Sequence, residues 1–107
     1  MPATDALLIL CNVPDTTCAH TIAQALVERR LAACVNILAP CQSVYRWQGK
    51  VETASEVPLL IKSTAERYAE LESALRSLHP YEVPEIIALP IAAGLPAYLA
   101  WLVQETA

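Results

Sequence analysis

Residues 43–52 of the chain read SVYRWQGKVE. Apolar and polar side chains alternate from Ser43 to Trp47, and residues 48–50 supply a turn, so the pattern predicts an antiparallel hairpin. The return arm runs from Val51 to about Lys62. Pro58, in the middle of that arm, has no N–H to donate and must lie at an edge or a bulge. Arms of roughly 12 residues are about twice the length of a typical strand.

The far end of this hairpin predicts an oligomer. Two helices can cover only part of such a sheet, so the end of the hairpin needs cover from elsewhere. Tyr45 and Trp47 fall on one face there and would expose a large apolar surface to water. Pairing with a strand of a second copy would cover that surface and satisfy the free edge, and repetition around an axis would close a ring.

Elements of alternating type precede the hairpin. The apolar run at residues 7–13 predicts a buried strand that ends at Pro14. Asp15 can cap the amphipathic helix that follows, and a second strand begins near Ala33. Pro40 interrupts this strand before it continues into the hairpin.

A second set of elements follows the hairpin. Ser63 and Glu66 form a candidate capping box for a second helix, which ends at His79 because a proline comes next. A strand at residues 85–90 and a short helix at 97–105 complete the chain. The order strand, helix, strand, strand, helix, strand predicts an α+β fold, a ferredoxin-like sandwich with both main helices on one face of an antiparallel sheet and a C-terminal helix added.

Composition indicates one globular unit. The chain has 107 residues, of which 55% are hydrophobic and 17% charged. Residues 1–107 are therefore interpreted as a single domain, because either half would be too small to bury a core of its own. The large apolar share also favours burial of surface against another subunit.

Charge and hydropathy bear on partners and location. The net charge of −4 and the lack of a basic cluster beyond Arg29 and Arg30 argue against nucleic acid as a partner. No apolar run reaches the roughly 18 residues of a membrane-spanning helix. The N-terminal segment lacks the layout of a secretory signal, so we expect a cytoplasmic protein with four free thiols, at Cys11, Cys18, Cys34 and Cys41.

Several stretches together resemble a known family. They are LAACVNI at residues 31–37, SVYRWQGKVE at 43–52, LLIKST at 59–64, HPYEVPEI at 79–86 and YLAWL at 98–102. In this order they are similar to the CutA family of divalent cation tolerance proteins. The resemblance implies a ferredoxin-like protomer in a compact homotrimer, with hairpin strands crossing between subunits, much like the PII signalling proteins.

The resemblance also implies a role in tolerance of divalent metals, copper above all. Metal binding in the family is ascribed to a cysteine at the end of the first strand, a histidine near HPY and the glutamate of PE. The matching residues here are Cys11, His79 and Glu85. Some members carry a second histidine directly before HPY, where this chain has Leu78, so a site that needs that histidine would be incomplete.

Each implied ligand has a structural alternative. Cys11 follows an apolar run and could be a small core residue. His79, at the end of a helix, could cap carbonyl groups. Glu85 could form an ion pair with Lys62.

Five further residues are candidates for a ligand cleft between subunits. They combine a thiol, a cation and three aromatic rings: Cys34, Tyr45, Trp47, Lys62 and Tyr81. Aromatic residues at a subunit boundary can equally serve as packing anchors.

Two functional hypotheses follow. The first is a trimeric protein without enzymatic activity that binds Cu²⁺ or another divalent cation through Cys11, His79 and Glu85. The alternative is a PII-like signalling or scaffold module that holds a small anionic metabolite against Lys62 and the aromatic rings. Catalysis is not expected, because no nucleophile motif or glycine-rich phosphate loop is present among only two glycines.

Overall fold

The computed structural model describes residues 4–107 and contains five strands and three α-helices. In chain order these are β1 (Ala6–Val13), α1 (Thr16–Glu28), β2 (Cys34–Ile37), β3 (Cys41–Trp47), β4 (Lys50–Thr64), α2 (Tyr68–Leu78), β5 (Ile86–Pro90) and α3 (Pro96–Glu105), with a 3₁₀ turn at Ala65–Arg67 before α2. Every strand pairing is antiparallel. The α+β class and the antiparallel sheet predicted from the sequence are confirmed.

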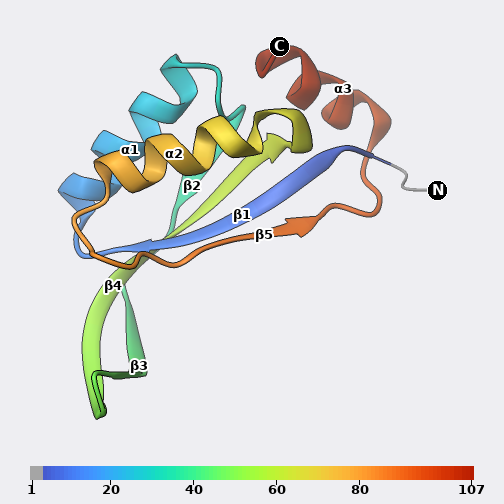
Figure 1. The fold of residues 1–107 in the computed structure, drawn as a ribbon. Coiled ribbons are helices and arrows are strands. Elements are labelled where there is room, and N and C mark those ends of the chain that lie inside the picture. The colour runs from blue at the N-terminus through green and yellow to red at the C-terminus, as the bar shows by residue number, and fades with distance from the viewer. Residues whose placement is uncertain (1–3) are drawn as a thin grey trace.

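The long strand β4 organises the sheet. Four strands follow the order β2-β4-β1-β5, and β3 pairs only with the first part of β4. Figure 1 shows α1 and α2 side by side on one face of this sheet, while the β3–β4 hairpin extends well beyond them. The molecule is consequently elongated, with principal extents of 44 × 29 × 24 Å.

The core lies between the sheet and the two helices. Alternate residues of the central strands, such as Ile9 and Ile61, are fully buried against Ile22 of α1 and Leu75 of α2. Asp15 caps α1 as expected, because its Oδ1 accepts a hydrogen bond from the Cys18 N–H at 2.8 Å.

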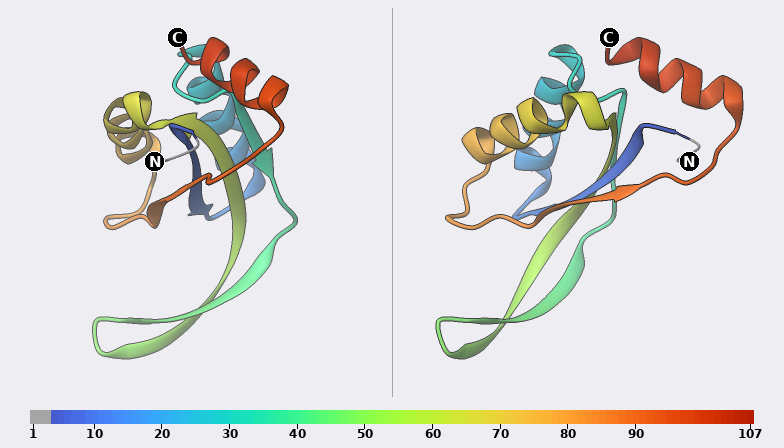
Figure 2. Two further views of the ribbon diagram at one scale, coloured as in Figure 1. Left: turned by 90° about the vertical axis from the view of Figure 1, so that its right-hand side faces the viewer. Right: turned by 45° about the vertical axis from the view of Figure 1, so that its right-hand side comes forward.

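The opposite face of the sheet carries α3 over one end, where Leu102 packs against Ala6 and Ala33, and Figure 2 shows no helix over the rest of it. We call it the open face and define it by residues that alternate with the buried ones: Leu8, Leu10, Cys34, Asn36, Leu60, Lys62, Ile87 and Leu89. Ile87 and Leu89 remain 50% and 45% exposed. The apolar surplus seen in the sequence is therefore concentrated in part on this face.

Pro58 lies inside β4, at the point where its neighbour changes. β2 ends opposite Leu59 and β3 begins opposite Glu56, so Pro58 faces the gap between them. Its carbonyl accepts a hydrogen bond from the Leu38 N–H across this gap. Because the N–H and C=O of a strand residue point to the same side, the missing donor faces this gap, where the partner of β4 changes from β2 to β3.

The predicted capping box at Ser63 is wrong. Ser63 belongs to β4, opposite Leu7 of β1, and its buried hydroxyl donates to the Leu31 carbonyl at 2.6 Å. The helix α2 begins at Tyr68, later than that capping box implied. Pairing with β1 thus extends the strand through a sequence whose local pattern favoured a helix start.

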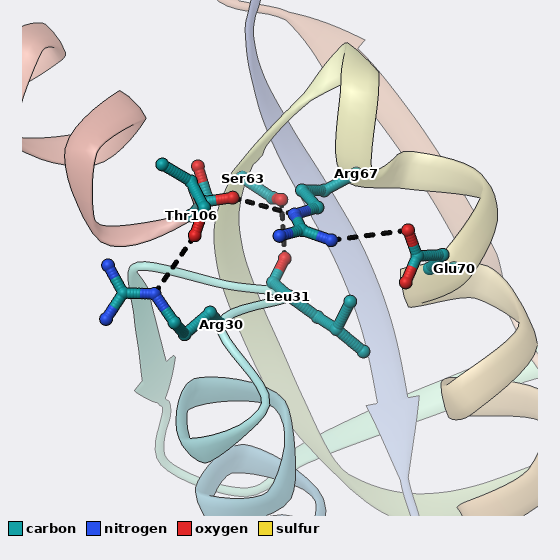
Figure 3. A network of polar contacts seen from close by, with 7 residues as sticks. Arg30, Leu31, Ser63, Arg67, Glu70 and Thr106 are labelled. Carbon is teal, nitrogen blue, oxygen red and sulfur yellow. Dashed lines mark hydrogen bonds and ion pairs between the residues drawn. The ribbon is translucent and has the colours of Figure 1, made fainter.

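Two arginines hold the C-terminal end of α3 against the rest of the chain (Figure 3). The Arg30 guanidinium donates to the Gln104 and Ala107 carbonyls, at 2.9 and 3.1 Å. Arg67 donates to the Thr106 carbonyl at 2.7 Å. These bonds satisfy carbonyl groups that a helix end otherwise leaves free.

None of the helices within residues 4–107 is both long and apolar enough to span a membrane.

Candidate functional site

A cavity of about 680 Å³ lies where the hairpin leaves the sheet. Its walls come from the end of β1, from β3 and β4 in the hairpin, and from the segment between α2 and β5. Three of the lining residues are carboxylates, and the others are polar, aromatic or apolar. The carboxylates are Glu56, Glu82 and Glu85, and the others are Asn12, Ser43, Val44, Tyr45, Trp47, Tyr81 and Val83.

His79 fixes the segment that forms one wall of the cavity. Its side chain is buried, with 6% exposure, and its Nε2 contacts the Asn12 carbonyl at 2.7 Å. The Tyr81 N–H donates to Nδ1 at 3.1 Å, so Nδ1 is the unprotonated nitrogen and Nε2–H is the donor. Both ring nitrogens are therefore engaged within the chain. The partner of Nε2 belongs to β1 and not to α2, so His79 joins α2 to the sheet.

Tyr81 and Glu56 join the opposite walls. The Tyr81 hydroxyl donates to Glu56 Oε2 at 3.0 Å, and Glu56 is only 8% exposed. Burial, with the hydrogen bond to Glu56 as the next contribution, raises the pKa of Tyr81 to about 12. Tyr81 consequently remains protonated and can donate to the carboxylate throughout the physiological pH range.

Cys11 lies behind the cavity, in the core. It is 1% exposed, and burial raises the pKa of its thiol to about 12, with the carboxylates of Glu85 and Glu56 adding to the effect. A thiol binds metal as the thiolate, which this environment disfavours. Its position agrees with the core alternative considered from the sequence.

Glu85 does line the cavity, but it does not form the suggested ion pair with Lys62. Its Oε1 accepts a hydrogen bond from the Asn12 amide at 3.3 Å. Lys62 lies opposite Leu8 in the register, whereas Glu85 comes just before the pairing of Ile86 with Cys11. The two side chains are thus separated by about four strand positions, or roughly 13 Å along the sheet.

The three predicted metal ligands do not form one site within a single chain. No group of three or more His, Cys, Asp or Glu side chains that could hold a metal ion occurs among the residues described, 4–107. Cys11 and His79 are buried on the core side, and only Glu85 reaches the cavity.

The predicted cleft residues fall into two separate places. Tyr45, Trp47 and Tyr81 line the cavity. Cys34 and Lys62 face each other across β2 and β4 on the open face instead. The separation follows from the register, because Lys62 lies at the end of β4 remote from the hairpin.

Sequence reasoning missed Asn12, Glu56 and Glu82 as cavity residues. Asn12 is a polar residue at the end of an apolar strand, directly after Cys11, and this was a usable signal. Glu56 gave none, because only the pairing of β4 with β3 and the position of Tyr81 bring it to the cavity.

The chain is similar to known proteins along nearly its whole length. The profile of the family described as CutA1 divalent ion tolerance protein matches residues 7–105. The divalent-cation tolerance protein CutA of Thermus thermophilus is 52% identical over 99 residues, which cover 92% of this chain and 96% of that protein. The corresponding protein of Pectobacterium atrosepticum is 46% identical over 101 residues, covering 94% and 92%.

A solved structure agrees with this assignment. The crystal structure of CutA from Xylella fastidiosa superimposes with a TM-score of 0.95 at 45% identity, covering 97% of this chain and all of that one. The resemblance seen in the sequence is confirmed, and the chain belongs to the CutA1 family of divalent ion tolerance proteins.

Proposed function

We propose that this protein acts in divalent-cation tolerance as a cytoplasmic homotrimer without enzymatic activity, and that it binds a divalent cation, Cu²⁺ foremost, at the cavity beside the hairpin. The observation that carries the proposal is that three carboxylates, Glu56, Glu82 and Glu85, line one cavity, where within residues 4–107 they do not by themselves form a metal-binding group. Carboxylate oxygens in a confined space favour a cation, and the amide oxygen of Asn12 is a further candidate donor.

The three ligands predicted from the sequence differ in how readily they could bind a metal ion. Of these, Glu85 is the ligand that we propose first from this chain. Binding by Cys11 would require a thiolate in the core, and binding by His79 would break a hydrogen bond to Asn12 or Tyr81. Because one chain offers an incomplete set, we propose that a neighbouring subunit completes the coordination.

The fold supports the proposed trimer. The order β2-β4-β1-β5, with two helices on one face, supports a ferredoxin-like description of the protomer. The protruding hairpin and the uncovered apolar face supply surfaces through which a PII-like ring would close.

The alternative of a small anionic metabolite has less support at this cavity. Lys62, which was to hold the anion, lies on the open face, and the cavity is lined by carboxylates. An anion placed there would meet negative charge, and no Lys or Arg is among the described residues that line the cavity.

Calorimetric titration of Cu²⁺ tests the proposal and its ligands together. Glu85→Gln is expected to weaken binding by about tenfold or more, because it removes one charged oxygen donor. Cys11→Ala is expected to bind as the wild type does. Glu66→Gln, on the exposed 3₁₀ turn, is the matched control for the loss of one negative charge.

The outcomes separate the possibilities. Unchanged affinity in Glu85→Gln contradicts the cavity site. Loss of binding in Cys11→Ala, with the fold retained, would transfer the site to the thiol. Sedimentation of the purified protein checks the assembly, which should have three times the chain mass of 11.6 kDa.

A further inference from the structure

The cavity beside the hairpin has room for an organic molecule. Its volume of about 680 Å³ falls within the range of small-molecule pockets, which is about 300 to 1,000 Å³. A divalent cation needs its oxygen ligands gathered about 2.0 to 2.6 Å from one point. Glu56, Glu82 and Glu85 line the cavity, yet among residues 4–107 they do not form such a group. The three carboxylates are therefore distributed over the cavity wall.

Glu56 has an oxygen that the chain leaves without a partner. The residue is 8% exposed and its Oε2 accepts from Tyr81, but no hydrogen bond or ion pair to Oε1 occurs within residues 4–107. Every fully buried side-chain oxygen among these residues has a partner, so Oε1 must be accessible from the cavity. A largely buried carboxylate is costly unless a positive group lies beside it. No Lys or Arg is among the described residues that line the cavity, so a ligand would supply that charge.

Aromatic and apolar side chains form much of the remaining wall. Tyr45, Trp47 and Tyr81 line the cavity together with Val44 and Val83. The faces of Tyr and Trp rings attract organic ammonium groups. Methylene groups also gain free energy when they leave water for such a wall, whereas a hydrated metal ion does not. Carboxylates set among rings thus suit positive charges carried on an aliphatic chain.

We propose that the cavity binds a linear aliphatic diamine or longer polyamine, whose ammonium groups contact separate carboxylates while its methylene chain lies against the aromatic rings. One ammonium group donates to Glu56 Oε1, and another reaches Glu82 or Glu85 on the wall between α2 and β5. Alkylammonium groups resemble the lysine side chain, whose pKa is about 10, so both ends are charged at neutral pH. This ligand class goes beyond the divalent cation of the proposed function, although both proposals use the same cavity.

The proposed homotrimer does not require this cavity to close. The open face, as defined above, includes none of the residues that line it. The neighbouring subunit that we propose to complete the metal coordination would border the same cavity. The measurements below therefore use the intact assembly.

Calorimetric titration of diamines into the metal-free protein tests the proposal. The diamines are 1,4-diaminobutane, 1,6-diaminohexane and 1,8-diaminooctane, and each is compared with the monoamine and the diol of the same length. The tightest diamine is expected to bind about tenfold or more tightly than its monoamine, because a second ammonium group pairs with a second carboxylate. The diol should show no measurable binding.

Substitution of single carboxylates locates the charge contacts. Glu56→Gln and Glu82→Gln should each weaken diamine binding by about threefold to tenfold. Glu66→Gln, on the exposed 3₁₀ turn, removes the same charge outside the cavity and should bind as the wild type does. Because Glu82 is exposed, Glu82→Gln tests the proposal even if Glu56→Gln fails to fold.

Tryptophan fluorescence reports where the ligand binds. Trp47 lines the cavity and Trp101, the only other tryptophan, does not. Diamine should therefore change the emission of Trp101→Phe and leave that of Trp47→Phe unchanged. The reverse result would overturn the proposal.

The remaining outcomes separate this inference from the metal proposal. Equal affinity for diamine and monoamine, or full affinity in both Glu56→Gln and Glu82→Gln, would overturn the diamine site. Binding of Cu²⁺ without any binding of diamine would overturn this inference and leave the proposed function intact. Binding of diamine without Cu²⁺ would support this inference and contradict the metal site.

Discussion

Asn12 shows how one residue can connect the cavity walls. Its carbonyl accepts from the buried His79 ring, and its side-chain amide donates to Glu85. Because Asn12 lies near the end of strand β1, these two bonds attach the start and the end of the segment from His79 to Glu85 to the sheet. The position of the Glu85 carboxylate thus depends on these contacts with Asn12 as well as on strand β5, which follows Glu85 in the chain.

The buried Cys11 thiol makes stability depend on alkaline pH. Its pKa is about 12 in the folded state against an ordinary value of 9.0 when unfolded. The folded form holds this proton more tightly, so the contribution is complete below pH 9 and is lost as pH rises from about 9 to about 12. The free energy of unfolding should fall by about 1.4 kcal/mol per pH unit from this group within that window.

Urea unfolding at pH 8 and pH 10, under reducing conditions, measures this slope. Cys11→Ala removes the titrating group and should show a smaller decrease between the two pH values, while Cys41→Ala serves as the control. An equal decrease in wild type and Cys11→Ala would contradict the assignment.

The hydrogen bond between Tyr81 and Glu56 should contribute measurably to stability. Tyr81→Phe leaves the buried Glu56 carboxylate without this donor, and the expected loss is about 1 kcal/mol in the free energy of unfolding. Tyr45→Phe is the matched control, because no hydrogen bond of its hydroxyl occurs within residues 4–107. Equal stability of the two variants would show that water replaces the lost partner.

Strand β4 contains both a correct and an incorrect prediction from the sequence. Alternation and the turn residues predicted the hairpin, because these are local signals that pairing with β3 reinforces. Ser63 was misassigned because a capping-box pattern is also local, whereas the pairing of Ser63 with Leu7 joins residues far apart in the chain. The ends of an element depend on such distant partners.

The same distinction applies to the candidate site. Tyr45 and Trp47 were found because they lie on the hairpin, whose geometry the sequence predicts. Lys62 was grouped with Glu85 because both flank apolar strands, and only the register shows that they lie at different ends of the sheet. The separation of Lys62 from Glu85 could be seen only once the strand pairing was known, and no local sequence pattern specifies that pairing.

The hairpin turn predicts opposite effects of two substitutions. Gln48 and Gly49 both have positive φ, 49° and 81°, as a two-residue type I′ turn requires. Gly49→Ala should destabilise the protein by about 1 kcal/mol, because alanine is strained at this positive φ. The added methyl group would cause no clash, since no atom lies within 4 Å of it. Gln48→Asn should stabilise, since asparagine adopts this conformation more readily. Thermal unfolding would measure both, and a stabilising Gly49→Ala would contradict the turn geometry.

At the scale of the whole molecule, the two faces of the sheet differ in kind. One face carries α1 and α2 and forms the core, while the open face presents Leu8, Leu10 and Leu60 at its centre. Ile87 and Leu89 continue this apolar surface onto β5. An apolar face of this kind on a small chain favours burial against another subunit.

Substitution on this face should therefore change the proposed assembly. Ile87→Glu places a charge in a surface that would be dry between subunits, and an unpaired buried charge costs several kcal/mol, so the dissociation constant should rise by about 100-fold or more. Val27→Glu is the matched control, because Val27 is also partly exposed but lies on α1. Sedimentation at micromolar concentration should show smaller species for Ile87→Glu alone. Circular dichroism should show both variants folded, and a fully assembled Ile87→Glu would mean that the open face is not the contact surface.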